Sequence, residues 1–389
     1  MTVLIYRYGS ICEPDIIETL RGFRVEVEEI CEEMADKQLT AARRVELVSR
    51  GIDKCHPVFV FSINFFPAIA EVCHIYKVPY FCWTVDSPIP ELFSKSIQRE
   101  TNRVFLFDRA QYNDFSGFNP DCIFHLPLAA ATERFDKVIQ SASKQDLERF
   151  AGDISFVGSL YSEKNKLSKI ALPEYTKGYI DGVVESSLKV YGYNFMEEAL
   201  PENIVQAIKK NASNFYDAED SLVNTDRYVA AHSYVGYHAA EMERIRTLNT
   251  LAEHFKVDLY TRSDVTPLRG INVHGGVQTH TEMPLVFHQS RINLNMTIKP
   301  IQTGLPLRIF DIMGCGGFCM TNYQEELTEH FEIGVDLEAY ASLDELVDKC
   351  AYYLSHEEQR AQIARNGYLK VKEKHGYQAR VMEMLRKVL

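Results

Sequence analysis

The stretch that decides the fold is residues 302–317, Gln-Thr-Gly-Leu-Pro-Leu-Arg-Ile-Phe-Asp-Ile-Met-Gly-Cys-Gly-Gly. An apolar run at 291–296 precedes it and another at 318–321 follows it. This pattern predicts a strand, a turn, a short helix and a second strand. Pro306 suits the first turn of a helix and the glycines suit its end, so we expect the helix to begin near 303–306.

The start of this helix is a candidate anion site. A helix that begins just past the carboxyl end of a parallel strand directs free N–H groups and its positive dipole end at bound phosphate. Arg308 and Asp311 are three residues apart and share a helix face. A cation for diphosphate and a carboxylate for ribose hydroxyls are what a nucleotide-sugar site needs. The same features also occur in helices that only connect strands, where such a pair is a solvated ion pair.

Length and composition restrict the class of protein. A chain of 389 residues fits two domains, and 46% hydrophobic with 25% charged residues is typical of a globular protein. The formal charge of -12 argues against broad binding to nucleic acid or to an anionic membrane. No apolar stretch of about 18 residues is present, so no membrane span is expected.

The cysteines indicate the compartment. Nine cysteines, an odd number, are scattered and lie mostly inside apolar runs. They are typical of reduced core residues, and Cys315 with Cys319 lacks the second half of a zinc motif. Residues 1–8 read as a strand without a long apolar region, so we expect no signal peptide and a cytoplasmic protein.

Residues 1–150 are expected to form an N-terminal Rossmann-like domain. Short apolar runs alternate with helical segments, which predicts a doubly wound parallel sheet with ligands at the carboxyl ends of its strands. The expected strands are 3–8, 24–28, 58–62, 80–85, 104–107 and 122–126. The expected helices are 13–20, 33–50, 68–76, 91–100 and 109–115.

Several polar residues follow these strands and are candidates for an acceptor-side cleft: Gly9, Ser10, Asn64, Asp86 and His125. Asp86, before Ser-Pro, could form a turn or helix cap, or serve as general base for an acceptor hydroxyl. His125 is a weaker candidate, because a lone His is commonly a packed or surface residue. No Gly-x-Gly-x-x-Gly follows the first strand, which disfavours a nicotinamide dinucleotide site.

Residues 151–372 are expected to form a second Rossmann-like domain. A buried strand at 151–159 opens it, and alternation stops over 161–237, a polar segment that predicts a helical insertion, either lying over the cleft or merely ornamental. Tyr-rich stretches at 175–193 and 228–237 could contact an acceptor or simply pack. Further elements are expected at 239–255 (helix), 257–261 (strand), 276–279 (strand) and 283–289 (helix).

The C-terminal part is predicted to be helical. Ser342 to Glu345 and Ser355 to Glu358 both have the spacing of a capping box, each before a helix. We expect 373–389 to be a helix that packs back toward the N-terminal domain. Two facing parallel-sheet domains with an anion-binding helix start in the second predict the GT-B arrangement of glycosyltransferases, with the donor in the second domain and the acceptor in the first.

Specific motifs carry a family resemblance. Residues 291–295 (Arg-Ile-Asn-Leu-Asn), 304–318, 322–327 and 363–367 resemble the glycosyl transferases group 1 family, and more narrowly the bacterial spore-maturation CgeB-like glycosyltransferases. Residues 61–66, 78–88 and 156–161 resemble the uncharacterised N-terminal domain that often precedes it. The resemblance covers most of the chain and implies a nucleotide-sugar site.

The resemblance also implies roles for residues. In the wider retaining GT-B group, two glutamates eight positions apart hold the donor. Asp311 matches the second and would bind ribose hydroxyls, whereas the first falls at Thr303, which leaves the contact to the sugar ring and the stereochemistry open. For the diphosphate, Lys299, Arg308 and Arg262 are substitutes by position, and Ser159 lies near the loop where an Arg is usual.

The leading hypothesis is metal-independent transfer of a sugar from a nucleoside diphosphate sugar, with UDP expected, to a hydroxyl of a glycan, protein or small molecule. Thr303 and Gly304 at the helix start would help to hold the diphosphate, and Asp86 would act on the acceptor. No metal or other cofactor is expected, since no Asp-x-Asp element is present. Alternatives are a sugar-nucleotide epimerase or hydrolase, and a non-catalytic GT-B-like binding protein. Nothing in the sequence distinguishes a monomer from an oligomer.

Overall fold

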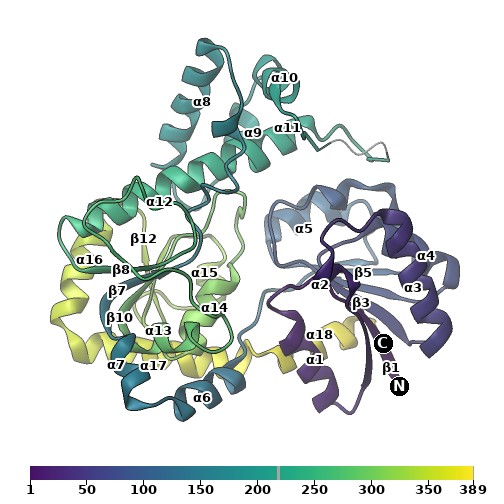
Figure 1. Ribbon diagram of the computed structural model, residues 1–389, viewed down its shortest axis with the longest axis horizontal. Helices are drawn as coiled ribbons and strands as arrows, with labels where there is room; N and C mark the ends of the chain where they lie inside the picture. The colour runs from purple at the N-terminus through teal and green to yellow at the C-terminus, as the bar shows by residue number, and fades with distance from the viewer. Residues whose placement is uncertain (217–219, 389) are drawn as a thin grey trace. The chain divides into compact units, whose positions relative to one another are not determined.

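The computed structural model describes residues 1–216 and 220–388, which form two compact units (Figure 1). Of the described residues, unit 1 contains 1–128, 220–225 and 377–388, and unit 2 contains 129–216 and 226–376. From the sequence pattern, 129–150 were expected in the first domain. The structure groups this segment with unit 2, because helices α6 (Thr132–Ser141) and α7 (Lys144–Arg149) pack against α13 (Met283–Gln289).

Unit 1 is built on a parallel sheet with strand order β2-β1-β3-β4-β5-β6, so all six predicted strands are present. The strands all run parallel, and the order in which successive strands are added to the sheet changes direction between β1 and β3, which is its topological switch point. The strands are β1 (Thr2–Tyr6), β2 (Glu26–Ile30), β3 (Phe59–Ile63), β4 (Tyr80–Trp83), β5 (Asn102–Leu106) and β6 (Ile123–His125).

The helices of unit 1 match the predictions less closely. The helix expected over 33–50 is two helices, because the chain leaves helical geometry after α2 and Thr40 caps a new helix by accepting a hydrogen bond from the Arg43 amide at 3.2 Å. The helix expected over 91–100 is two 3-10 turns separated by Ser94. The helices are α1 (Glu13–Gly22), α2 (Glu32–Ala35), α3 (Ala41–Cys55), α4 (Pro67–Tyr76), η1 (Pro90–Phe93), η2 (Lys95–Gln98), α5 (Arg109–Ser116) and α18 (Tyr377–Val388).

The C-terminal helix α18 belongs to unit 1 and packs against α1. The Tyr377 ring meets the Trp83 ring edge-on, with centroids 6.0 Å apart. The guanidinium of Arg380 donates a hydrogen bond to the Leu128 carbonyl at 3.2 Å. The last strand end of unit 1 and the C-terminal helix are therefore tied together.

Unit 2 has a second parallel sheet, with strand order β12-β11-β10-β7-β8-β9 and its switch point between β7 and β10. The strand predicted at 276–279 is wrong, since the edge strand β9 lies earlier in the chain. The three-residue strand β12 was not predicted, because so short a segment shows no clear alternation. The strands are β7 (Gly152–Val157), β8 (Val257–Tyr260), β9 (Asn272–Val273), β10 (Ser290–Asn295), β11 (Cys319–Asn322) and β12 (Glu338–Tyr340).

Residues 302–317 and the strands on either side form the predicted strand, turn, helix and strand: β10, α14 (Leu307–Gly314) and β11. Pro306 is the N-cap residue of α14, so the helix begins at Leu307, just after the predicted start, and Thr303 and Gly304 lie in the turn before it. Gly316 has a φ of +73°, which ends the helix in the left-handed region. A Cβ on Gly317 would lie 2.5 Å from the Phe287 carbonyl oxygen and 2.7 Å from the Asn293 amide nitrogen, so this position needs glycine.

The insertion in unit 2 is helical, as predicted, and its helices α8 to α11 stand together beside α12 in Figure 1. The segment 220–225 belongs to unit 1, and within that unit the Leu222 amide donates to the Phe93 carbonyl at 2.8 Å. The elements are η3 (Leu167–Lys169), α8 (Glu174–Ser187), α9 (Met196–Ala199), α10 (Glu202–Asn211), α11 (Asp226–Tyr228), the π-helical η4 (Val229–Val235) and α12 (Gly236–Ala252).

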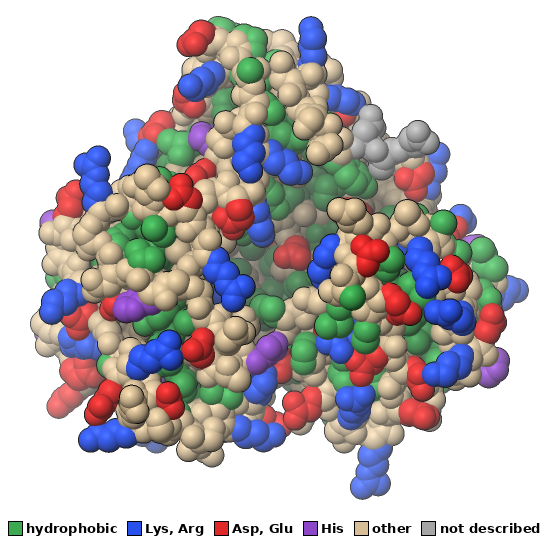
Figure 2. All heavy atoms as spheres, viewed as in Figure 1, with side chains coloured by type: hydrophobic (Ala, Val, Ile, Leu, Met, Phe, Trp, Pro, Cys, Tyr) green, Lys and Arg blue, Asp and Glu red, His purple; other side chains and the backbone are tan. Residues whose placement is uncertain are grey.

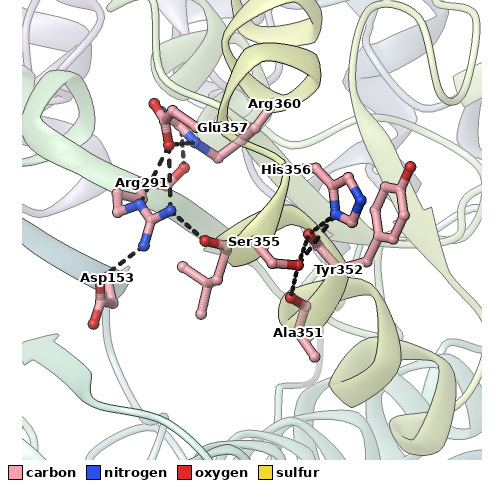
Figure 3. A network of polar contacts seen from close by, with 9 residues as sticks. Asp153, Arg291, Ala351, Tyr352, Ser355, His356, Glu357 and Arg360 are labelled. Atoms are coloured by element: carbon pink, nitrogen blue, oxygen red, sulfur yellow. Dashed lines mark hydrogen bonds and ion pairs between the residues drawn. The ribbon is translucent and has the colours of Figure 1, made fainter.

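The amino edge of the unit 2 sheet carries a polar network that holds the last helices of the unit (Figure 3). Arg291 of β10 contacts Asp153 of β7 at 3.4 Å and Glu357 at 3.3 Å, and Arg360 donates to the Arg291 carbonyl at 2.8 Å. The remaining helices are α15 (Leu327–His330), α16 (Leu343–Ser355) and α17 (Glu357–Lys374).

Only one of the two predicted capping residues caps its helix. The Ser342 hydroxyl accepts a hydrogen bond from the Glu345 amide at 3.1 Å and caps α16. The prediction at Ser355 is wrong: His356 is the N-cap residue of α17, and the Ser355 hydroxyl donates back to the Ala351 carbonyl at 3.0 Å.

Candidate active site

At the switch point of unit 2, a buried arginine joins the ends of two strands. Arg244 of α12 donates to the carbonyl of Ser159, after β7, and to the carbonyl of Met296, after β10, the latter at 2.8 Å. Its guanidinium lies 4.4 Å from the centre of the Tyr161 ring. Burial lowers the pKa of Arg244. Arg244 therefore fixes the distance between the two loops that border the crevice, the place where open α/β sheets bind ligands.

The turn before α14 is held by residues that follow β11. The Thr303 hydroxyl bonds to the Glu326 carboxylate at 2.8 Å, and the Gln324 side chain donates to the Gly304 carbonyl at 3.3 Å. Glu326 is 1% exposed. A buried carboxylate thus lies beside Thr303, the position at which the resemblance implies an acidic residue.

Arg308 and Asp311 lie on one face of α14, as predicted, with the guanidinium 3.2 Å from the carboxylate. Asp311 is 5% exposed, whereas a quarter of the Arg308 side chain remains exposed. The guanidinium lies 5.2 Å from the centre of the Phe287 ring. Arg308 can therefore bind a phosphate while its stem stays packed, and Asp311 is oriented by its neighbour.

Lys299, expected to face the diphosphate, is engaged by the insertion. Its ammonium donates to the Val190 carbonyl at 2.6 Å and lies 5.1 Å from the centre of the Tyr191 ring. In return, the Asn194 side chain donates to the Lys299 carbonyl at 2.8 Å. Burial lowers the pKa of Lys299, while the Glu243 carboxylate opposes that shift. The connection between α8 and α9 is thus anchored on the loop that follows β10.

Ser159 and Arg262 belong to the neighbouring loops. The Ser159 hydroxyl accepts from the Tyr161 amide at 2.7 Å and bonds to Glu163, whose carboxylate also accepts from Ser263 at 2.9 Å. Ser159 therefore stabilises a turn. Arg262 is exposed after β8 and lies against Gly276.

In unit 1, Asn64 joins three strand ends. Its amide nitrogen donates to the Tyr8 hydroxyl at 3.0 Å and to the Asp86 carboxylate at 2.6 Å, and its oxygen accepts from the Val85 amide at 3.0 Å. Asn64 has a φ of +57°, in the left-handed region. Burial and the charge of Asp86 raise the pKa of Tyr8. The structure thus brings the predicted residues Asn64 and the exposed Asp86 together with Tyr8, which the sequence pattern did not indicate.

Of the other predicted residues of unit 1, Ser10 joins this group, because its side chain forms a hydrogen bond with the Tyr8 hydroxyl. The Gly9 amide, at a φ of +94°, donates to the buried Glu13 carboxylate at 3.1 Å, and Ser10 lies next to it with its hydroxyl near the Cys12 amide, at 3.5 Å. His125 ends the edge strand β6, and its carbonyl accepts from Lys387 at 3.2 Å.

Arg244, Glu243 and Glu326 were also missed. The run Glu-Met-Glu-Arg of 241–244 looks like a solvated helix, and nothing in its spacing shows that Glu243 and Arg244 are buried. Glu326 lies 23 residues beyond Thr303. Only the fold brings these side chains to the strand ends.

The surface and the wider chain add two observations. On the face drawn in Figure 2, Lys and Arg side chains are interspersed with Asp and Glu side chains. Over residues 1–216 and 220–388, no helix is long and apolar enough to cross a membrane, and no three His, Cys, Asp or Glu residues are grouped closely enough to hold a metal ion.

Residues 238–386 match a family model described as Glycosyl transferase-like. No curated protein sequence matches the chain. Among solved structures, HepE of Anabaena in complex with UDP-glucose is similar, with 11% identity, coverage of 100% of this chain and 99% of that chain, and a TM-score of 0.56. Sucrose-phosphate synthase from Thermosynechococcus elongatus is also similar, with 8% identity, coverage of 99% of this chain and 98% of that chain, and a TM-score of 0.59.

A glycosyltransferase from Rickettsia africae has 11% identity, coverage of 99% of this chain and 97% of that chain, and a TM-score of 0.54. At these identities the likeness shows the fold. The chain therefore has the GT-B fold, with two Rossmann-like α/β units, and its residues 238–386 match the glycosyl transferase-like family.

Proposed function

We propose that the protein transfers a sugar from a nucleoside diphosphate sugar to a hydroxyl of an acceptor. The observation that carries the proposal is the start of α14, where Arg308 and the buried Asp311 lie together just beyond the carboxyl end of β10. This helix lies within the segment that matches the glycosyl transferase-like family. UDP is the first nucleotide to test, because UDP-glucose is bound in the similar HepE structure.

In this proposal the donor is bound by unit 2. The N–H groups at the start of α14 and the Arg308 guanidinium neutralise the diphosphate as charge develops on the leaving group, and Asp311 accepts hydrogen bonds from ribose hydroxyls. Thr303 and Gly304 shape the turn. Arg262, exposed at the neighbouring strand end, is available to an anion. Lys299 contributes to phosphate binding only if its ammonium exchanges the bond to Val190.

The acceptor is assigned to unit 1. Asp86 is the candidate base that takes the proton of the acceptor hydroxyl, held by Asn64 and close to Tyr8. With inversion, the hydroxyl oxygen attacks the anomeric carbon, the bond to the diphosphate breaks and Asp86 takes the proton. With retention, the leaving phosphate takes it. In both cases cations and helix N–H groups supply the charge stabilisation, so we propose transfer without a metal.

A test of nucleotide binding compares melting temperatures with UDP, GDP, dTDP and CMP for wild type, Asp311→Ala and the exposed control Asp344→Ala. A ligand at 100 times its Kd stabilises by about 2.7 kcal/mol, a shift of several degrees. We expect a diphosphate-selective rise that Asp311→Ala abolishes and Asp344→Ala keeps. A rise that survives in Asp311→Ala would contradict the assignment of ribose binding to Asp311.

Transfer is separated from the alternatives by products. A UDP-sugar incubated without acceptor should stay largely intact. Rapid hydrolysis or epimerisation without acceptor would favour the second class of enzyme, and binding without turnover under any acceptor would favour a non-catalytic protein.

Finer features of the proposal rest on the sequence. None of the nine cysteines, all within the described residues, forms a disulfide bond, in keeping with the reducing, cytoplasmic location that we propose. The bacterial CgeB-like relationship stays a prediction.

A further inference from the structure

The topological switch point of unit 1 carries polar side chains from three strand ends. Tyr8 lies two residues beyond β1, Asn64 directly follows β3, and Asp86 lies three residues beyond β4. The strands β1 and β3 are neighbours in the sheet, on either side of the switch point. Open α/β sheets bind ligands in the crevice at this place. All three residues belong to unit 1.

The backbone near these side chains is held in place before any ligand binds. Glu13, which is 1% exposed, accepts hydrogen bonds from the Tyr8 amide at 3.0 Å and from the Gly9 amide at 3.1 Å. The three hydrogen bonds of the Asn64 side chain fix the neighbouring strand end, where the Asn64 backbone stays in the left-handed region at a φ of +57°. Backbone geometry of this kind costs energy and is concentrated at functional sites.

Asp86 presents an oxygen that can accept a hydrogen bond from a ligand. Its side chain is exposed, and its Oδ2 accepts from the Asn64 amide nitrogen at 2.6 Å. The other oxygen, Oδ1, has no hydrogen-bond partner among the described residues. Because the side chain is exposed, a ligand can reach this oxygen.

Tyr8 and Ser10 present a hydrogen that can be donated to a ligand. Their side chains form a hydrogen bond with each other, and the Tyr8 oxygen also accepts from Asn64 at 3.0 Å. Each hydroxyl has one hydrogen, and the bond between the two hydroxyls uses only one of the pair. No described residue accepts the other hydrogen. Both side chains are only half-buried, and burial and the charge of Asp86 raise the pKa of Tyr8, so its phenol keeps its proton.

A ligand with hydroxyl groups fits this site better than an ion. The accepting oxygen of Asp86 and the donating Tyr8–Ser10 pair lie close together, because Asp86 and Tyr8 both bond to the same nitrogen of Asn64. A phosphate only accepts hydrogen bonds and is repelled by Asp86, and an ammonium group only donates. Two neighbouring hydroxyls of a sugar ring satisfy both groups, since one can donate to Asp86 while the next accepts from the Tyr8–Ser10 pair.

We propose that Tyr8 and Ser10, together with Asp86, bind two adjacent hydroxyls of a neutral sugar, which makes the acceptor a carbohydrate. That this sugar is the acceptor rests on the proposed function, whereas sugar binding itself does not. In the proposed transfer the hydroxyl on Asp86 is the one that reacts, and its neighbour on Tyr8 holds the ring in place. Tyr8 therefore selects acceptors that have a hydroxyl next to the one that reacts.

The test measures sugar binding by saturation-transfer NMR in the presence of UDP, which has no sugar to transfer. The probes are methyl glucoside, methyl galactoside and methyl mannoside, with cyclohexanol as a ring of the same size that has a single hydroxyl. Wild type should bind at least one glycoside and not cyclohexanol. Tyr8→Phe, which removes only the hydroxyl, should weaken glycoside binding about tenfold, the scale of one lost hydrogen bond. Tyr76→Phe is the matched control and should bind as wild type, because the Tyr76 hydroxyl also bonds to a side chain of unit 1, that of Asp53 at 3.1 Å.

Monodeoxy derivatives of the glycoside that binds best show which hydroxyl each side chain holds. Asp86→Ala, at an exposed residue, should also weaken glycoside binding about tenfold. Removal of the hydroxyl held by Tyr8 should weaken binding to wild type but not to Tyr8→Phe, and removal of the hydroxyl held by Asp86 should weaken binding to wild type but not to Asp86→Ala. The two hydroxyls should be on adjacent carbons. A merely structural role of either residue would instead weaken the binding of all derivatives equally.

Urea midpoints, followed by the fluorescence of Trp83 on β4, show whether unit 1 of each variant is folded, and Asp86→Ala provides the comparison if Tyr8→Phe unfolds. Equal glycoside binding by wild type and the folded variants, or equal binding of cyclohexanol and the glycosides, would overturn the inference. Absence of glycoside binding by wild type that shows the UDP shift would overturn the inference and leave the proposed function standing. Glycoside binding in the expected pattern without a shift from any nucleotide would overturn the proposed donor site and leave sugar binding by unit 1 standing.

Discussion

Replacing Asn64 by alanine should loosen the strand ends of unit 1 and release Asp86. The Asn64 side chain makes three hydrogen bonds, to Tyr8, Asp86 and the Val85 amide. Its backbone has a φ of +57°, which Asn and Gly tolerate better than Ala. The substitution therefore removes the hydrogen bonds and adds backbone strain, and the two effects can be separated with Asn64→Gly.

The expected magnitude follows from these contacts. The bonds to Tyr8 and Val85 contribute about 1 kcal/mol each, and the bond to the exposed Asp86 contributes less than about 1 kcal/mol, since water competes for the carboxylate. Left-handed geometry costs alanine a further 1 kcal/mol or so. We expect Asn64→Ala to lower the free energy of unfolding by about 3 to 4 kcal/mol. Asn64→Gly should lower it by about 2 to 3 kcal/mol, because glycine relieves the strain but makes the unfolded chain more flexible.

Trp83 provides the assay. It is the single tryptophan of the chain and lies buried on β4, so its fluorescence reports the unfolding of unit 1. With an m-value of about 2 kcal/mol/M, the urea midpoint of Asn64→Ala should fall by about 1.5 M or more. The UDP-dependent shift should stay unchanged, since the donor residues all lie in unit 2. Equal midpoints for wild type and both variants would refute this account of Asn64.

Two further predictions concern stability. The pKa of Glu33 is lowered: burial alone would raise it, but hydrogen bonds from Arg44 and Tyr6 outweigh burial. The contribution of Glu33 to the free energy of unfolding is therefore complete above the ordinary pKa of 4.5 and is lost as the pH falls through the lower pKa of the folded state. Urea midpoints of Glu33→Gln between pH 7 and 3 should thus vary less with pH than those of wild type. Gly317→Ala should lower the free energy of unfolding by about 1 to 3 kcal/mol, because its Cβ would collide with the Phe287 carbonyl. A Gly22→Ala control has open space at its Cβ and should unfold as wild type in the same urea titration.

Much of the fold is predictable because its signals are local. Most strands of unit 1, such as β3 and β4, and the strands on either side of α14 are short runs of largely buried residues, for which residue propensity and hydrophobic pattern both predict a strand. Failures occur where the local signal is weak or tertiary contacts decide. The two-residue β9 is a strand because it pairs with β8, and nothing in its own sequence requires that.

The candidate site was predictable only in part. Arg308 and Asp311 could be paired from spacing, because three residues along a helix place side chains on one face. The contact between Lys299 and Val190 could not be predicted, because the two residues are 109 positions apart in the sequence. Arg244 and Glu243 have the sequence of a solvated helix, and only the packing of α12 over the strand ends shows that they are buried.

The two edges of the unit 2 sheet show why the site belongs at the carboxyl edge. At the amino edge, Arg291 and its partners Asp153 and Glu357 are 34% to 58% exposed, and they pair with one another (Figure 3). At the carboxyl edge, the charges of Glu243, Arg244 and Lys299 are all at least nine-tenths buried. Exposed ion pairs change the free energy of unfolding little, whereas buried charges lower it unless each has its full set of charge and hydrogen-bond partners. One Glu243 oxygen, Oε1, lacks a hydrogen-bond partner among the described residues, so the carboxyl edge retains an arrangement that stability alone does not favour, as is typical of functional sites.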